Sequence, residues 1–254
     1  MFSATINSPV VVGDRELWVV ELGLIDYDEA HRFQRAAARL RVRGEMPQDL
    51  LILCEHPRVV TTGRSTKAGN LHASAEALAE HSVQLRDVER GGDVTIHEPG
   101  QLVGYPIIDL KRHRPDLHWY LRQIEEVLIV ALGEWSLDCG RRGGQTGVWI
   151  ANRKLASIGV HARDWVTSHG FALNAHNDLT TFNWIVPCGI VGVTMTSVER
   201  ECTAIAVDAP SALELRDSVV RACAEVFTLS ARTAAQDILS SIRAEMIEPV
   251  PSPR

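Results

Sequence analysis

The five cysteines, at positions 54, 139, 188, 202 and 223, are the residues of this sequence best suited to nucleophilic chemistry. Their number is odd and none forms a C-x-x-C pair, so the pattern indicates neither a disulfide framework nor a zinc knuckle. Four are interpreted as small packing residues in a reducing compartment. Cys188 differs, because it stands between Pro187 and Gly189 where a strand gives way to a turn. Its neighbours leave a structural role and a catalytic role both open.

Two glycine clusters are further candidates for a binding site. The segment GRRGGQTG (140–147) has neither the Gly-Lys-Ser/Thr ending of a phosphate loop nor the G-x-G-x-x-G spacing of a dinucleotide turn, so neither role is expected. The segment RGGDVTIHEPGQ (90–101) sets paired glycines, which let backbone approach a ligand, between Arg90 and His97. A ligand-binding segment and a plain hairpin explain it equally well.

Charge, histidine spacing and hydropathy exclude several classes of protein. The ten histidines form no H-x-x-x-H pair, so no bound metal is expected, and no G-x-S-x-G motif supports a serine hydrolase. With 26 basic and 32 acidic residues the net charge is −6, which argues against nucleic acid as a partner. No run approaches the roughly 18 apolar residues of a membrane span, and no basic leader precedes an apolar run. We therefore expect a cytoplasmic protein without a membrane association.

The elements that must position these residues alternate along the 254-residue chain. Apolar spacing predicts helices over 26–43, 74–81, 117 to near 140, 210–227 and 233–247. Strands are predicted over 17–22, 50–54, 59–62, 83–88, 94–97, 102–108, on both sides of 151–153, and over 165–174. This order predicts one α/β (α+β) domain with a mixed, largely antiparallel sheet flanked by helices. The predicted boundaries are a flexible N-terminal segment (1–14), a domain (15–248) and a Pro-rich tail (249–254).

Four segments, in this order, are similar to one known family: RGGDVTIHEPGQLVGYPI, RKLASIGV, HGFALNAHNDLTTF and IVPCGI. Together they resemble the octanoyltransferases of protein lipoylation, members of the biotin/lipoate transferase and ligase superfamily. The resemblance covers roughly residues 15 to 230. The interval of 34 residues from Lys154 to Cys188 also resembles the family's spacing of lysine and cysteine. The resemblance implies that 15–248 is a catalytic domain with the biotin/lipoyl ligase-like fold.

The resemblance also implies an activity. The enzyme would transfer an octanoyl group from octanoyl acyl carrier protein to a lysine of lipoyl domains, the first step of endogenous protein lipoylation. The acceptors would be lipoyl domains of 2-oxoacid dehydrogenase complexes and the glycine cleavage H protein. No cofactor is implied, because the acyl group arrives as a thioester and its transfer to an amine needs no ATP.

The same resemblance assigns roles to residues. Cys188 would carry the acyl-thioester intermediate, and Lys154 would be the acid/base that tunes it, since a nearby ammonium favours the thiolate. Backbone N–H groups of Cys188 and Gly189 are candidates for holding the developing oxyanion. The implied substrate-binding residues form three segments: Arg90, Gly91, Gly92, Asp93, Val94, Thr95, Ile96 and His97; Ser157, Ile158 and Gly159; Gly170, Phe171 and Ala172.

Two departures from the family pattern bear on the predicted pocket. The family usually has an aromatic residue where Ile96 stands and glycine where Glu98 stands. These departures affect the expected shape of the acyl pocket and the expected conformation of the loop near His97. Basic clusters at 111–114 and 141–142 are candidate docking sites for acidic partners, although solvated turns explain them as well.

Three alternative functions remain open. An ATP-dependent lipoate ligase of the same fold would also use a lysine near position 154, but would not need Cys188. A lipoyl amidotransferase would use a cysteine of its own. A catalytically inactive module that binds acyl carrier protein is favoured if Lys154 and Cys188 lie far apart.

Overall fold

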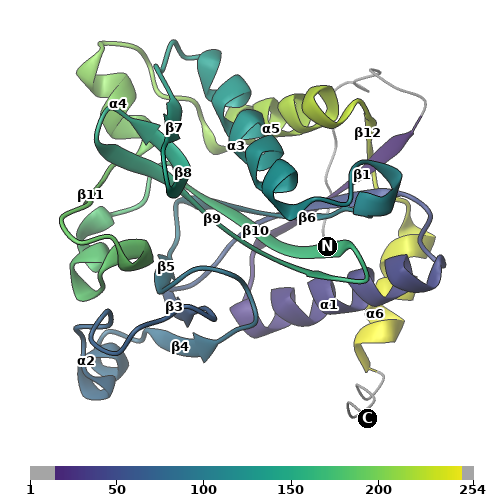
Figure 1. Ribbon diagram of the computed structural model, residues 1–254, viewed down its shortest axis with the longest axis horizontal. Coiled ribbons are helices and arrows are strands. Elements are labelled where there is room, and N and C mark those ends of the chain that lie inside the picture. Colours follow the sequence, from purple (N-terminus) through teal and green to yellow (C-terminus); the bar gives the residue numbers. More distant parts are fainter. Residues whose placement is uncertain (1–14, 248–254) are drawn as a thin grey trace.

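A large mixed sheet with helices on both faces forms the centre of the protein (Figure 1). The computed structural model describes residues 15–247, and the predicted N-terminal segment (1–14) and Pro-rich tail (249–254) lie outside them. Its helices are α1 (Tyr27–Arg43), α2 (Ala75–Glu80), α3 (Leu117–Gly133), α4 (Val198–Ala204), α5 (Ala212–Phe227) and α6 (Gln236–Ile247), with 3₁₀ turns η1 (Leu110–Arg112), η2 (Leu179–Trp184) and η3 (Pro187–Gly189). Its strands are β1 (Glu16–Leu24), β2 (Asp49–Glu55), β3 (Val59–Thr62), β4 (Gln84–Asp87), β5 (Thr95–His97), β6 (Gln101–Ile107), β7 (Gly140–Arg142), β8 (Gln145–Ile150), β9 (Arg153–Arg163), β10 (Val166–Asn174), β11 (Thr194–Met195) and β12 (Ser230–Thr233).

The strand order of the main sheet is β12-β1-β2-β6-β10-β9-β8-β7, with β11 paired to β9. β1 runs parallel to both β12 and β2, whereas the steps from β2 through β6, β10, β9 and β8 to β7 are antiparallel. The predicted α/β class and the mixed, largely antiparallel sheet are therefore confirmed. A smaller sheet, in the order β4-β3-β5, carries the segment around Thr95 and was not distinguished in the sequence.

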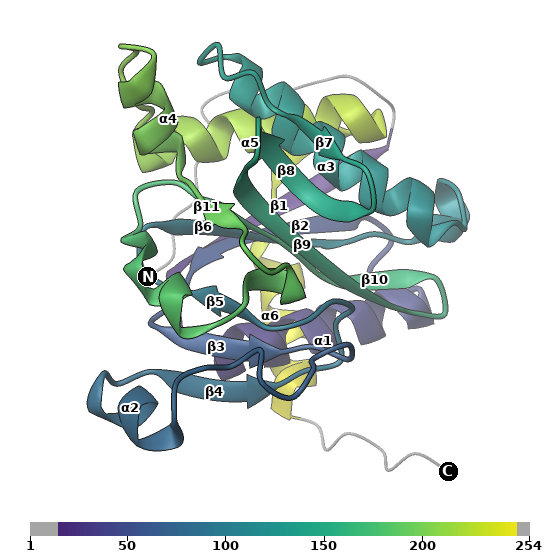
Figure 2. The same ribbon diagram turned by 60° about the vertical axis from the view of Figure 1, so that its left-hand side comes forward.

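The main sheet separates two hydrophobic cores. α3 and α5 cover one face and α1 with α6 the other, as Figure 1 shows above and below the strands. Side chains of β2 alternate between the two cores, since Leu51 and Leu53 pack under α3 while Leu50 and Ile52 pack under α1. A third core lies between the small sheet and η2. In Figure 2 this small sheet lies beside the long hairpin of β9 and β10, where the site is found.

Local signals explain where the principal helices begin. Asp26 caps α1 by accepting from the backbone N–H of Asp28 at 2.9 Å, and Asp116 caps α3 in the same manner. Ser211 and Glu214 form a capping box at the start of α5. α3 ends at Gly133 rather than near Gly140, because the chain turns through the left-handed backbone of Ser136. α4 and the short strands β7, β11 and β12 were missed.

No helix within residues 15–247 is both long enough and apolar enough to span a membrane.

Candidate active site

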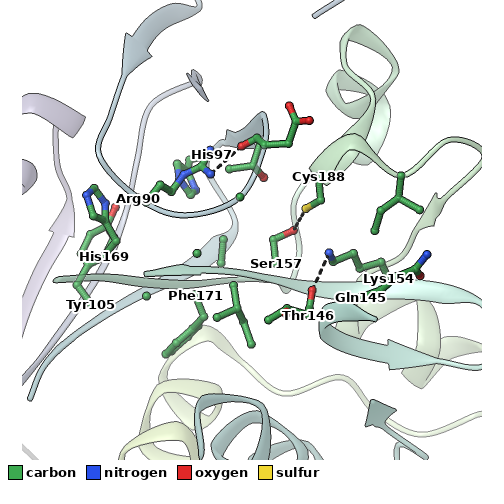
Figure 3. A pocket seen from close by; sticks show the side chains of 18 of the residues that line it. Arg90, His97, Tyr105, Gln145, Thr146, Lys154, Ser157, His169, Phe171 and Cys188 are labelled. Atoms are coloured by element: carbon green, nitrogen blue, oxygen red, sulfur yellow. Dashed lines mark hydrogen bonds between the residues drawn. The ribbon is translucent and has the colours of Figure 1, made fainter. Parts of the chain in front are cut away.

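A cavity of about 270 Å³ lies between the β9–β10 hairpin, the segment 90–97 and the turn η3. The predicted site residues that line it come from all three predicted segments and the catalytic pair: Arg90, Gly92, Asp93, Thr95, His97, Lys154, Ser157, Ile158, Gly159, Gly170, Phe171, Ala172 and Cys188. Residues far apart in the sequence therefore meet in one pocket, with Cys188 and Lys154 near each other at one end (Figure 3).

Three predicted substrate-binding residues do not line the pocket. Thr95 and His97 face it, while Val94 and Ile96 turn into the third core, because successive side chains of a strand point to opposite faces. Gly91 donates its backbone N–H to Val160 at 2.8 Å and joins the loop to β9. The departure at Ile96 therefore changes core packing beneath the pocket and leaves the cavity wall untouched.

Cys188 sits at the tip of η3 in a left-handed backbone conformation, with φ of 55°. Its Sγ lies 3.5 Å from Oγ of Ser157 on β9. The neighbouring Gly189 is also left-handed, and a Cβ there would lie 2.5 Å from Asp93 Oδ2, so the turn packs directly on the 90–97 segment. A left-handed residue outside glycine costs of order 1 kcal/mol and concentrates at functional sites.

The backbone N–H groups proposed for an oxyanion hole are already engaged. Cys188 N–H donates to Val94 O at 3.0 Å, and Gly189 N–H donates to Val186 O at 2.9 Å. Both bonds shape the turn that presents the sulfur. The expectation that these two groups hold an oxyanion is therefore wrong for this conformation.

Lys154 projects from β9 into the pocket although its residue surface is only 1% exposed. Its Nζ donates to Thr146 O at 3.0 Å and lies 5.3 Å from the centre of the Trp149 ring. Among residues 15–247 no carboxylate lies within 4.0 Å of this nitrogen, and the sulfur of Cys188 is not its hydrogen-bond partner. The ammonium charge is thus held by neutral groups and faces the cavity. Gly147 makes room for it, since a Cβ there would lie 2.8 Å from Lys154 Cε.

Arg90 was predicted to bind the substrate, and in the structure its side chain stabilises the loop to which it belongs. Its guanidinium donates to Thr61 O and to Asp93 O, each at 2.7 Å, and burial lowers its pKa. The loop approaches β9 closely enough that a Cβ at Gly159 would lie 2.8 Å from Gly91 O. These contacts explain why small residues occupy both sides of this part of the pocket.

The apolar wall depends on close contact between β6 and β10. A Cβ on Gly170 would lie 2.2 Å from Gly104 O, and a Cβ on Gly104 would lie 2.1 Å from the ring of Phe171. The two glycines therefore let the Phe171 ring lie against the sheet on the side of the α3 core, where Ile158 packs beside it. Ala172 points to the opposite face, the one that carries Ser157, and borders the cavity there.

The sequence matches the lipoyl protein ligase A/B catalytic domain family over residues 26–224. An octanoyltransferase of Nostoc sp. is 45% identical over 82% of this chain and 90% of that protein. An octanoyltransferase of Geotalea uraniireducens is 49% identical over 72% of this chain and 82% of that protein. The chain belongs to the lipoyl protein ligase A/B catalytic domain family.

Solved structures agree on the fold of this family member. A bi-partite lipoate protein ligase of Thermoplasma acidophilum, studied with its E2 lipoyl domain, has a TM-score of 0.70 at 17% identity over 92% of both chains. A lipoate-protein ligase A bound with ATP has a TM-score of 0.68 at 17% identity, over 91% of this chain and 94% of that chain. Together with the relatives, these likenesses confirm the predicted superfamily, its fold and an acyltransferase enzyme.

Sequence reasoning missed several residues of the family member's pocket. The additional lining residues are Tyr27, Tyr105, Gly144, Gln145, Thr146, His169 and Ile190. The segment 140–147 was considered as a phosphate loop, a dinucleotide turn and, at Arg141 and Arg142, a docking cluster, but not as part of this pocket, where the carbonyl oxygen of Thr146 accepts a hydrogen bond from Lys154. His169 stands next to Gly170 within the matching segment, which was the available signal. Tyr27 and Tyr105 carried no signal, because only tertiary packing brings them to the cavity.

Three buried histidines surround the end of the pocket distant from Cys188. Burial lowers the pKa of His97 to about 3 and those of His56 and His169 to about 4. Neutral imidazoles suit their contacts: His56 Nδ1 donates to Ile25 O at 2.8 Å, and its Nε2 accepts from the Tyr105 hydroxyl at 2.7 Å. We call His56, His97 and His169 the buried histidines.

Glu98, the second departure from the family pattern, is a buried anchor for η2. It accepts from Asn177 Nδ2 at 2.9 Å and from Thr181 Oγ1 at 2.8 Å, while burial raises its pKa. Because η2 leads into the turn that carries Cys188, this carboxyl group stabilises both that turn and the loop near His97, whose conformation the departure at Glu98 had left open.

The remaining cysteines and the basic clusters have structural roles. Cys54, Cys202 and Cys223 are buried and Cys139 half-buried, all as free thiols, which confirms their interpretation as packing residues.

In the basic clusters, Arg141 pairs with Glu125 and Glu126 on α3, and Arg142 lies over the Trp149 ring. In the other cluster His113 pairs with buried Asp49. These partners favour a structural explanation for most of both clusters.

Proposed function

We propose that the protein transfers an octanoyl group from octanoyl acyl carrier protein to a lysine of lipoyl domains through an acyl thioester on Cys188. The observation that carries the proposal is the convergence of a reactive-type cysteine and a buried lysine on one apolar-walled cavity. The family's octanoyltransferases supply the acyl group by analogy.

In the first half-reaction the neutral amine of Lys154 would take the proton of the Cys188 thiol and become the ammonium, and the sulfur would attack the donor's thioester carbonyl. The bond from that carbonyl to the donor sulfur breaks, and the leaving thiolate takes the proton back from Lys154. In the second half-reaction an acceptor lysine amine attacks the new thioester. The carbon–sulfur bond to Cys188 breaks, and Lys154 would pass the amine's proton to the departing sulfur.

The electrostatics of the pocket support these roles. The Lys154 ammonium has no carboxylate partner among the described residues, so its charge is available to an anion in the cavity. The Ser157 hydroxyl, 3.5 Å from the Cys188 sulfur, is positioned to donate to a thiolate there. Since the backbone N–H groups of the turn are engaged, Lys154 is also our candidate for stabilising the oxyanion.

The shape of the cavity supports a medium-chain acyl group. Its volume of about 270 Å³ is small for a site that must enclose both an acyl group and a nucleotide. Tyr27, Tyr105 and Ala172 line the cavity and offer apolar contacts, and each buried methylene contributes roughly 0.8 kcal/mol to binding.

The acylation test mixes the purified protein with octanoyl acyl carrier protein and follows the intact mass. We expect one octanoyl addition, removed by hydroxylamine and absent in Cys188→Ala. Cys139→Ala is the matched control, because it removes another thiol that is not fully buried but lies outside the pocket. An addition that survives in Cys188→Ala would refute the assignment of the nucleophile.

The acceptor test adds lipoyl domains of a 2-oxoacid dehydrogenase complex, or the glycine cleavage H protein, to the octanoylated enzyme. The octanoyl mass should move to the acceptor without ATP. The runner-up is a lipoate ligase, favoured by the ATP-bound structure of the same fold. Transfer that requires ATP and free octanoate would establish the ligase in its place.

A further inference from the structure

Two histidines and a glutamate meet at the end of the pocket away from the catalytic pair. His31 lies on α1, Glu89 immediately precedes the Arg90 loop, and His169 lies on β10. Figure 3 places His169 across the pocket from Cys188. His31 Nε2 is 3.2 Å from Glu89 Oε1, and His169 Nε2 is 3.8 Å from Glu89 Oε2. One atom of each side chain lies within 4.8 Å of the other two.

The imidazole of His169 has an unused coordinating atom. The residue is 2% exposed, and its Nε2 has no hydrogen-bond partner among the described residues, since 3.8 Å is too long for such a bond. Buried polar atoms without a partner are rare and destabilise the folded state. This atom points toward a carboxylate and a second imidazole, which is the arrangement that a metal ion would complete.

The backbone holds the three side chains in place. His169 adopts a left-handed conformation within β10, with φ of 56°, and its N–H donates to Gln34 Oε1 at 2.9 Å. Gln34 is one turn along α1 from His31, so this bond ties together the two elements that carry the histidines. Arg90 fixes the position of the Glu89 loop through its bonds to Thr61. A site built on such anchored elements requires little reorganisation.

We propose that His31, Glu89 and His169 bind one divalent transition-metal ion of the Zn²⁺ class. Two imidazoles and a carboxylate form a donor set that this class prefers, and three protein ligands leave a fourth position for water. Tetrahedral bonds of about 2.0–2.1 Å set ligand atoms about 3.3 Å apart, so the present distances require only small side-chain rotations. Side-chain exposures of 16% for His31 and 30% for Glu89 leave access for the ion and its water.

This site revises the expectation that the protein binds no metal. That expectation relied on short histidine spacings, whereas His31 and Glu89 are 58 residues apart in the chain and His169 follows 80 residues later. The ion would join α1, β10 and the loop before Arg90 at the wall of the cavity. Its binding is independent of the proposed acyl transfer.

The test uses the full chain, freed of metal with a chelator and titrated with Co²⁺ and then with Zn²⁺. We expect one Co²⁺ per chain with the visible absorption of a four- or five-coordinate ion, displaced by Zn²⁺. His31→Ala and Glu89→Gln should each weaken binding by about tenfold or more, because the first removes an imidazole ligand and the second replaces the carboxylate with a neutral amide. His118→Ala, which alters an exposed histidine on α3, is the matched control and should bind as the wild type does.

Two further measurements keep the result decisive. Cys188→Ala should retain the Co²⁺ absorption, which separates this site from binding by the pocket thiol. Circular dichroism establishes that each variant is folded, and if His31→Ala is not, Glu89→Gln decides. The absence of stoichiometric binding to wild type, or equal binding by wild type and both ligand variants, would overturn the proposal.

Discussion

Replacing Lys154 separates its chemistry from its contribution to stability. Lys154→Met keeps a long side chain but removes the ammonium, and Lys154→Arg keeps a positive charge on a group that cannot be deprotonated in a protein. If Lys154 transfers protons, both variants should lose about 10²–10⁴-fold in transfer rate. If its charge alone favours the Cys188 thiolate, the arginine variant should retain much of the rate.

The structure also gives the expected change in the free energy of unfolding for Lys154→Met. The variant loses a charged hydrogen bond to Thr146 O, worth about 1.5–3 kcal/mol, and a contact with the Trp149 ring worth up to about 2 kcal/mol. Against these losses, an ammonium that is 1% exposed and lacks a carboxylate partner carries a desolvation cost of several kcal/mol. The opposing contributions nearly cancel, so the free energy of unfolding should change by no more than about 2 kcal/mol.

The assay has two parts. Rapid-quench mass spectrometry measures the rates of Cys188 acylation and of transfer to the lipoyl domain separately, and urea unfolding measures stability. A folded Lys154→Met variant with near wild-type rates in both half-reactions would refute the catalytic role. Destabilisation well beyond 2 kcal/mol together with retained rates would identify Lys154 as a structural residue.

Three further perturbations test other parts of the structure. Glu98→Gly removes two buried hydrogen bonds to the 177–181 segment and should lower the free energy of unfolding in urea by about 2–4 kcal/mol, whereas Glu98→Gln should lose less; equal stabilities would exclude an anchoring role. Gly170→Ala sets a Cβ 2.2 Å from Gly104 O and should cost about 3 kcal/mol, measured as a lower Tm, while Gly143→Ala, which has open space, serves as control. The buried histidines have pKa values below the unfolded value of 6.5, so their contribution to stability is present above pH 6.5 and is lost as the pH falls toward 4. Each histidine with a pKa of about 4 accounts for about 3 kcal/mol of the free energy of unfolding. A free energy of unfolding that stays constant between pH 7 and pH 4 would contradict their neutral state.

Local sequence signals predicted most of the elements. The caps at Asp26 and Ser211 and the spacing of apolar residues gave the principal helices, because both signals depend on neighbours within one or two turns. Strands at the sheet edge were harder to predict. β7 spans Gly140–Arg142, and such short polar segments become strands only through pairing with a neighbour.

The residues of the site show the same difference between what local sequence predicts and what tertiary contacts decide. Motifs in the sequence indicated Cys188, Lys154 and three segments as candidate site residues, and most of these residues line the cavity. The alternation of β5 decided that Ile96 turns away from it. Hydrogen bonding in the turn decided that the N–H of Cys188 is engaged, which no motif could reveal.

By itself, the sequence predicted most helices and strands from residue types and short spacings, and the resemblance of four segments indicated the family and the candidate residues Cys188 and Lys154. Only the tertiary structure decided that Thr146 holds the lysine and that His31, Glu89 and His169 form one cluster. Contacts between residues far apart in the chain depend on how strands pair and helices pack. Those arrangements are set by the cooperative burial of whole faces, which no local pattern encodes.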